Sequence, residues 1–194
     1  MKIAITGGIG SGKSVVAAYL QKKGFPVFSA DAVSRALTDS AAGVELVASR
    51  FPETVKEGVL DRKALASVVF SDPEKLKTLN GLLHPVIMRR LLEEMQEAET
   101  KGKPVFAEVP LLFESGSESL FDKIWIVRRD LNARVAAAAA RDGVEEKEIL
   151  CRIKNQTDYS VRDFSAHTII GNDGTQEELF RRIDGEIAEI YQGV

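Results

Sequence analysis

A glycine-rich segment at residues 7–14 reads G-G-I-G-S-G-K-S and matches the pattern G-x-x-x-x-G-K-[ST]. Its glycines allow the backbone to curl so that several N–H groups point at phosphate oxygens. An apolar run at Lys2–Thr6 comes before the segment, and a helical pattern begins at Lys13. We therefore predict a strand, a phosphate-binding loop and a helix in that order, which is the structural setting that the motif requires.

The residues that this pattern assigns to phosphate binding lie in the loop and in the first turn of the helix. They are Gly8, Ile9, Gly10, Ser11, Gly12, Lys13, Ser14 and Val15. Backbone N–H groups and the positive end of the helix dipole attract phosphate at such a position. Lys13 is expected to stabilise charge on the β- and γ-phosphates, and the Ser14 hydroxyl is the expected Mg²⁺ ligand.

Apolar runs rich in β-branched residues alternate with helical patterns, which is typical of βαβ units and a parallel sheet. Strands are predicted at Lys2–Thr6, Pro26–Ser29, Lys103–Val109, Lys123–Val127 and His167–Ile170. Helices are predicted at Lys13–Lys23, Asp31–Leu37, Ala41–Phe51, 72–83, Pro85–Glu99, Leu131–Asp142, Glu145–Asn155 and Gln176–Tyr191. The expected fold class is α/β, a three-layer P-loop NTPase-type fold with a parallel five-stranded sheet.

The connection between the second and third predicted strands is long and helical. Asp72-Pro73-Glu74 is typical of a helix start. We expect that helix to be broken at His84-Pro85, because a residue before proline avoids the α region. The chain, residues 1–194, is predicted to be one domain with a core (about 1–60, 101–130 and 163–194), a helical acceptor-binding insertion (about 61–100) and a lid (about 131–162).

Composition excludes several classes of protein. The formal net charge is −3, which disfavours proteins that coat nucleic acid or anionic membranes. The longest apolar runs have six residues, whereas a membrane-spanning helix needs about 18 to 20. The strand predicted from Lys2 leaves no room for a signal peptide. The chain has a single cysteine, Cys151, so we expect it to be cytoplasmic. We also expect that it binds neither nucleic acid nor membrane, and a monomer is favoured.

The phosphate-loop motif alone does not identify a reaction. The chain contains no N-K-x-D motif, which disfavours a GTPase that reads guanine. Its 194 residues are too few for an ABC-type, helicase or RecA-type motor. A compact phosphate-loop protein with a long helical insertion after the second strand is typical of small-molecule kinases, in which insertions hold the acceptor and cover the donor.

Motifs spread over nearly the whole chain resemble the dephospho-coenzyme A kinase family, and they occur in the family's order. They are T-G-G-I-G-S-G-K-S at 6–14, A-D-A at 30–32, G-V-L-D-R at 58–62, L-H-P at 83–85, V-P-L-L-F-E at 109–114, Arg141, Gln156, and I-G-N-D-G at 170–174. Departures from the family pattern are Ser29 for an aspartate, Leu131 for a glutamine, His167 for an aspartate and Val15 for a frequent threonine. These departures concern residues expected to contact the adenine and to form the lid. Lys13, Ser14 and Asp31 agree with the family pattern.

The resemblance implies ATP-dependent phosphorylation of the 3′-hydroxyl of the dephospho-CoA ribose. The products would be CoA and ADP, and this would be the final step of CoA biosynthesis. ATP and dephospho-CoA are then the expected partners, with Mg²⁺ as cofactor. Two alternatives stay open: another small P-loop kinase, for instance one for a nucleoside monophosphate, and a nucleotide-binding switch without an acceptor.

The resemblance also marks candidate catalytic residues. Asp31 follows the second predicted strand, where it could accept or orient the acceptor hydroxyl, or simply cap the next helix. Arg141 ends the alanine-rich helix, where it could close on the ATP phosphates or interact only with the helix dipole. Arg134 lies about two turns earlier on the same face, and it is either an assisting residue or a solvated surface charge.

Candidate acceptor contacts are Arg62, His84, Leu111 and Leu112. Each has a structural alternative: a surface ion pair for Arg62, a corner between helices for His84, and core packing for the two leucines. Asn172 and Gly174 follow the last predicted strand. There they are expected to contact the adenine of ATP, with a plain turn as the alternative. The Arg128-Arg129 pair is interpreted as solvated surface charge.

Overall fold

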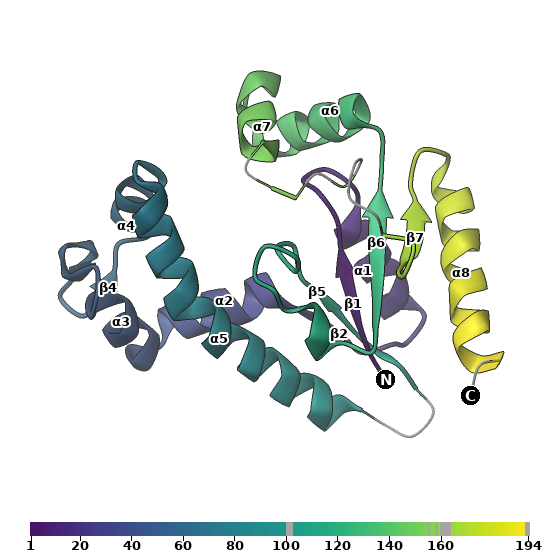
Figure 1. The fold of residues 1–194 in the computed structure, drawn as a ribbon, viewed down its shortest axis with the longest axis horizontal. Helices are drawn as coiled ribbons and strands as arrows, with labels where there is room; N and C mark the ends of the chain where they lie inside the picture. Colours follow the sequence, from purple (N-terminus) through teal and green to yellow (C-terminus); the bar gives the residue numbers. More distant parts are fainter. Residues whose placement is uncertain (100–102, 155, 158, 160–163, 193–194) are drawn as a thin grey trace. The chain divides into compact units, whose positions relative to one another are not determined.

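The structure is a computed structural model that describes residues 1–99, 103–154, 156–157, 159 and 164–192. These residues form two compact units, which are described separately below (Figure 1). The first unit comprises Met1–Phe28 and Met95–Val194, and the second comprises Ser29–Glu94. The predicted helix end at Asn155 and the predicted boundaries at residues 100, 101, 162 and 163 lie outside the described residues. Among the described helices, none is long and apolar enough to cross a membrane.

A five-stranded parallel sheet lies at the centre of the first unit, as predicted. Its strands are β1 (Lys2–Thr6), β2 (Val27–Ser29), β5 (Val105–Glu108), β6 (Lys123–Arg128) and β7 (Thr168–Gly171), in the order β2-β5-β1-β6-β7. Ile3 pairs with Phe106 of β5 on one side and with Lys123 of β6 on the other. The central position of β1 places the loop that follows it between neighbouring strand ends on both sides.

The sheet is buried on both faces, which explains why its strands are nearly continuous apolar runs. The helices α1 (Lys13–Lys22) and α8 (Gln176–Gln192) cover one face. Alternate strand residues pack with these helices in a single core of Ile3, Ile5, Val16, Leu20, Phe106, Trp125, Val127, Ile170, Leu179, Ile183 and Ile190. The intervening residues Ala4, Ala107 and Ile126 are also fully buried.

Glycines end two helices of the first unit, as their positions in the sequence suggested. Gly24 has a φ of 85°, and the N–H of Phe25 donates to the Leu20 carbonyl at 3.1 Å, which completes a Schellman cap on α1. Gly143, with a φ of 66°, ends α6 (Leu131–Asp142). The helix α7 (Glu146–Ile153) follows, and a short 3₁₀ helix, η2 (Glu118–Leu120), precedes β6.

The second unit is mainly helical. It contains α2 (Ala30–Asp39), α3 (Ala41–Ala48), a 3₁₀ turn η1 (Pro52–Thr54), α4 (Arg62–Phe70) and most of α5 (Pro73–Ala98). It also holds a hairpin of β3 (Val55–Lys56) and β4 (Val59–Leu60), which was not predicted. Both turn residues, Glu57 and Gly58, have positive φ values, as a tight two-residue turn requires. Strands of two residues are too short to give a periodic signal in the sequence.

The predicted helix break at His84-Pro85 is wrong, because α5 continues through both residues. Proline removes one backbone hydrogen bond, and an interior proline costs a helix about 3 kcal/mol. Packing offsets this cost, because an apolar stripe at helical spacing runs along α5 on both sides of Pro85. Leu79, Leu83, Ile87 and Leu91 are all buried. Tertiary packing therefore overrides the local preference of the residue before proline.

His84 lies on α5 beside that stripe, and burial lowers its pKa below the ordinary value of 6.5. Below pH 6.5 the unfolded chain therefore binds more protons at this residue than the folded protein does. We expect the free energy of unfolding to fall as pH drops from 7 through 6.5, and to fall less in a His84→Gln variant. Urea unfolding at pH 7 and pH 5 measures the difference. Equal pH dependence in the two proteins would contradict the expected burial effect.

Candidate functional site

The phosphate loop connects β1 to α1, as the motif predicted. Gly10 and Gly12 have positive φ values of 74° and 100°, a backbone region that other residues rarely adopt. Both are also closely packed: a Cβ on Gly10 would collide with the backbone of Arg134, and one on Gly12 with the side-chain amide of Asn172. The glycines are therefore needed for the curl of the loop and for the approach of its neighbours.

Lys13 lies at the first position of α1 with its side chain folded over the loop. Its Nζ donates to the carbonyls of Gly7 at 2.8 Å and Gly8 at 3.1 Å. The residue is only 9% exposed, so its ammonium group is held close to the loop. Ser14, the next residue, is exposed. This arrangement places a positive charge and an exposed serine at the N-terminus of a helix, where a phosphate group is favoured.

Asn172 ties the phosphate loop to the ends of two other strands. Its side-chain amide donates to the Ser11 carbonyl at 2.8 Å, and its backbone N–H donates to the Arg128 carbonyl at 2.8 Å. The N–H of Asp130 donates to the Asp173 carboxylate at 2.6 Å. The loops after β1, β6 and β7 are thus held together. Asn172 is thus bound to the phosphate loop, and its contact with adenine stays a prediction.

Gly174 lies at the start of α8, next to a capping box. The Thr175 hydroxyl accepts from the N–H of Glu178 at 3.3 Å, and the Glu178 carboxylate accepts from the N–H of Thr175 at 2.9 Å. The predicted contact between Gly174 and adenine also stays untested, but the capping box fixes the turn in which the glycine lies.

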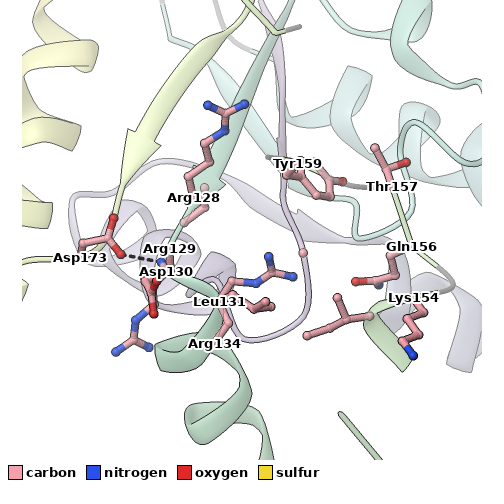
Figure 2. Close-up of a pocket in the computed structure, with 13 residues that line it drawn as sticks. Arg128, Arg129, Asp130, Leu131, Arg134, Lys154, Gln156, Thr157, Tyr159 and Asp173 are labelled. Atoms are coloured by element: carbon pink, nitrogen blue, oxygen red, sulfur yellow. Dashed lines mark hydrogen bonds between the residues drawn. The ribbon is translucent and has the colours of Figure 1, made fainter. Parts of the chain in front are cut away.

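A cavity of about 810 Å³ opens beside the phosphate loop (Figure 2). Figure 2 shows Lys154, Gln156, Thr157 and Tyr159 on one side of it, with Arg128 and Asp173 on the other. Its lining residues are Gly8, Val127, Arg128, Arg129, Asp130, Leu131, Arg134, Ile153, Lys154, Gln156, Thr157, Tyr159 and Asp173. Three arginines and a lysine against two aspartates make the lining basic, although the whole chain has a net charge of −3.

The interpretation of Arg128 and Arg129 as solvated surface charge is wrong. Both side chains are half-buried and line the cavity, and their Nε atoms are buried without a hydrogen-bond partner among the described residues. The Arg128 guanidinium also lies over the ring of Phe164, 5.5 Å from its centre. Arginines in such positions are suited to a polyanionic ligand, because a guanidinium binds phosphate oxygens with several donors at once.

Arg134 reaches the phosphate loop, whereas Arg141 does not line the cavity in the part of the chain that the structure describes. The Nε of Arg134 donates to the Ile9 carbonyl at 2.9 Å. Arg141 is exposed and pairs with Asp142 at 2.7 Å, and this hydrogen bond holds the pKa of Asp142 below its ordinary value. Of the two arginines that the sequence placed on one helix face, the earlier one is therefore part of the site in this structure.

Asp31 lies in the first turn of α2, in the second unit, and is exposed. The alternative that it caps this helix is wrong, because the cap is Ser29. The Ser29 hydroxyl accepts from the N–H of Ala32 at 3.3 Å. Ser29 is also the residue that departs from the pattern of the resembling family. Because Ser29 caps the helix, capping does not explain the position of Asp31.

Two other predicted acceptor contacts lie in the second unit. The Nη2 of Arg62 donates to the Thr38 hydroxyl and to the Asp39 carboxylate, both at 2.8 Å. Arg62 therefore connects the start of α4 to the end of α2. His84 is half-buried on α5. Their contacts with an acceptor stay predictions.

The two leucines that follow β5 differ in exposure. Leu112 is fully buried, and Leu111 is partly exposed. Leu111 is therefore the one of the pair that can present apolar surface to a ligand without rearrangement. The next residue, Phe113, packs against Tyr159 and Phe164. Tyr159 had no signal in the sequence that could have identified it as part of the cavity.

Comparisons with known proteins found similar sequences and similar structures. A family model described as dephospho-CoA kinase matches residues 1–178. A dephospho-CoA kinase from Thermus thermophilus is 40% identical over 191 residues, which cover 98% of this chain and 92% of that protein. A crystal structure from Thermus thermophilus is similar with a TM-score of 0.83 at 40% identity, covering 97% of each chain. A dephospho-CoA kinase structure from Campylobacter jejuni has a TM-score of 0.72 at 29% identity, covering 100% of this chain and 99% of that one.

Proposed function

This chain belongs to the dephospho-CoA kinase family, and we propose that it transfers the γ-phosphoryl group of ATP to the 3′-hydroxyl of the dephospho-CoA ribose. It is an ATP-dependent phosphotransferase. The observation that carries the proposal is the phosphate loop with Lys13 folded over it, beside a basic cavity of about 810 Å³. The predicted products are CoA and ADP. A cytoplasmic location and a monomeric state are also part of the proposal, with the single Cys151 as support for a reducing compartment.

The donor half of the proposal follows from the residues around the phosphate loop. Phosphoryl transfer depends mainly on positioning and on neutralising charge. Loop N–H groups and the N-terminus of α1 bind the phosphates, while Lys13 stabilises the charge that develops between the β- and γ-phosphates. Arg128, Arg129 and Lys154 supply further positive charge to the cavity that would hold ATP. Arg141 would exchange its carboxylate partner Asp142 for phosphate oxygens when the nucleotide binds.

The acceptor half rests on residues of the second unit and of the segment after β5. Asp31 follows the last residue of β2 by two positions, and ligands of open parallel sheets bind beyond the carboxyl ends of strands. In the proposal, Asp31 accepts the proton of the attacking 3′-hydroxyl or orients that hydroxyl. Arg62, His84 and Leu111 are proposed to contact dephospho-CoA, whereas Leu112, which was also predicted to contact it, is fully buried and packs in the core. For Arg62 this requires sharing its guanidinium between the acceptor and its partners in α2.

Mg²⁺ is proposed to bind together with ATP through the Ser14 hydroxyl. No group of three or more His, Cys, Asp or Glu side chains suited to a metal occurs among the described residues. This fits Mg²⁺, which commonly keeps several waters and is held by substrate phosphates with few protein ligands. Ser14, one residue after Lys13, is an exposed residue whose hydroxyl oxygen is a hard ligand of the required kind. When bound, the ion would neutralise charge on the β- and γ-phosphates.

The acceptor is tested by measuring ADP release with Mg-ATP and four candidates. These are dephospho-CoA, AMP, CMP and pantetheine phosphate. We expect dephospho-CoA alone to stimulate ADP release, with stoichiometric formation of CoA. Stimulation by AMP or CMP instead would identify a nucleoside monophosphate kinase. Slow ADP release that no acceptor stimulates would identify a nucleotide switch, and either result would overturn the proposal.

A further inference from the structure

Ile9 connects the phosphate loop to the helical hairpin α6–α7. We call this hairpin, together with Gln156 just after it, the α6–α7 arm (residues 131–154 and 156). The N–H of Ile9 donates to Gln156 Oε1 at 3.0 Å, and its carbonyl accepts from Arg134 Nε at 2.9 Å. Both backbone polar groups of one loop residue are thus engaged by side chains from opposite ends of the arm, so the Ile9 N–H, predicted to bind phosphate, is bound to Gln156 in this structure.

The side chain of Ile9 is also part of the small apolar core of the arm. That core consists of Val135, Ala138, Ala139 and Ile149, with the partly buried Ile9, Val144 and Ile153 packed against it. Ile9 is the one residue of this described cluster that does not come from the arm itself. Helices of 12 and 8 residues are marginal by themselves and depend on packing. Ile9 therefore adds to the packing on which these helices depend.

The loop and α6 are in contact on both sides of Ile9 as well. A Cβ on Gly8 would collide with the guanidinium of Arg134, and one on Gly10 would collide with the backbone of the same residue. The first turns of α6 therefore rest on residues 8–10. We therefore expect a change in the position of these residues to shift the start of α6, because close-packed atoms leave little room for independent movement.

We propose that Ile9 transmits occupancy of the phosphate loop to the α6–α7 arm. When phosphate groups fix the loop, Ile9 is fixed with it, and the arm gains order through the cluster and the two hydrogen bonds. Lys154 and Arg141, which lie on the arm, are then positioned to contact the nucleotide. Ile9 is in this sense a positioning residue that acts through the arm. The inference rests on ATP binding at the loop, as in the proposed function, but not on the identity of the acceptor.

Hydrogen exchange with and without a non-hydrolysable ATP analogue tests this coupling. In the wild-type protein the analogue should slow amide exchange in residues 7–14 and also in the arm, by about tenfold for a coupling of ordinary size. In an Ile9→Ala variant, residues 7–14 should still gain protection, whereas the gain in the arm should be largely lost. Ile9→Val, which keeps most of the contact, should restore it.

The matched control is Val144→Ala, which removes apolar contact from the same cluster within the arm. It should speed exchange of the arm in the absence of nucleotide but keep the slowing that the analogue causes. Gln156→Leu is a second variant, which leaves Ile9 in place and removes the side-chain amide that accepts from its N–H. It should lose part of the nucleotide-dependent protection of the arm.

The outcomes separate this inference from the proposed function. If the arm of Ile9→Ala or Gln156→Leu gained the same protection from the analogue as the wild-type arm does, the coupling through Ile9 would be overturned. If the wild-type loop gained no protection at all, nucleotide binding at the loop would be overturned, and this inference with it.

Discussion

Replacing Lys13 with methionine should lower kcat by about 1,000-fold, the effect expected when one group that stabilises developing charge is removed from an active site. Methionine keeps most of the length and apolar volume of the side chain but removes the ammonium group. In the structure this group is held 2.8 Å from the Gly7 carbonyl, directly over the loop. The fall in kcat should exceed the rise in KM for ATP, because the charge between the β- and γ-phosphates is largest in the transition state. Steady-state ADP release at saturating ATP and dephospho-CoA measures it.

Lys22→Met is the matched control for this prediction. Lys22 lies in the last turn of the same helix and is exposed, so its loss changes the net charge equally without touching the loop. Turnover of Lys22→Met should equal that of the wild-type protein. A Lys13→Met protein that folds normally and keeps kcat within tenfold of wild type would show that the ammonium group has no role in the transfer.

Asp31→Asn should lower kcat by about 100- to 10,000-fold, the range for removing a general base. The substitution is nearly isosteric and Ser29 caps α2 through its own hydroxyl, so the helix should keep its stability. Asparagine cannot accept the proton of the 3′-hydroxyl at a useful rate. The KM for dephospho-CoA should change much less than kcat if the acid acts on the reacting hydroxyl. Rates at saturating substrates, together with a thermal melt, separate loss of chemistry from loss of folding.

Glu45→Gln provides the control for Asp31→Asn. Glu45 is an exposed acid on the neighbouring helix α3 of the same unit, and its neutralisation should leave kcat unchanged. Near-wild-type turnover in Asp31→Asn would remove Asp31 from the mechanism. In that case the acid would contribute only its favourable interaction with the N-terminal end of α2.

The sheet and most helices were predictable because their signals are local. The limits of β1 at Lys2–Thr6 and of α6 at Leu131–Asp142 agree with the prediction at both ends. In each case a period in apolar residues coincides with a local stop signal, such as Gly143 after α6. Pro85 shows the limit of this reasoning. Its effect on the backbone is local, but the burial of the apolar stripe of α5 on both sides of it decides the outcome.

The candidate site was predictable where one short segment contains all the necessary parts. The phosphate loop is such a segment, because the fixed spacing of its glycines, lysine and serine determines the geometry of the loop. Arg128 and Arg129 gave no comparable signal. Two adjacent arginines after a strand look like surface charge in any sequence, and only the fold shows that both line a cavity beside Gly8.

The sequence by itself therefore determined that this chain forms a parallel α/β sheet with a phosphate loop at the end of its first strand. Motifs over nearly its whole length also pointed to one kinase family. Only the tertiary structure decided that Asn172 supports Ser11 and that Arg134 and Gln156 hold Ile9. These three contacts join residues more than a hundred positions apart. Spacing along a chain predicts contacts within a turn or a helix, whereas contacts between distant segments exist only once the packing of the whole sheet has brought those segments together.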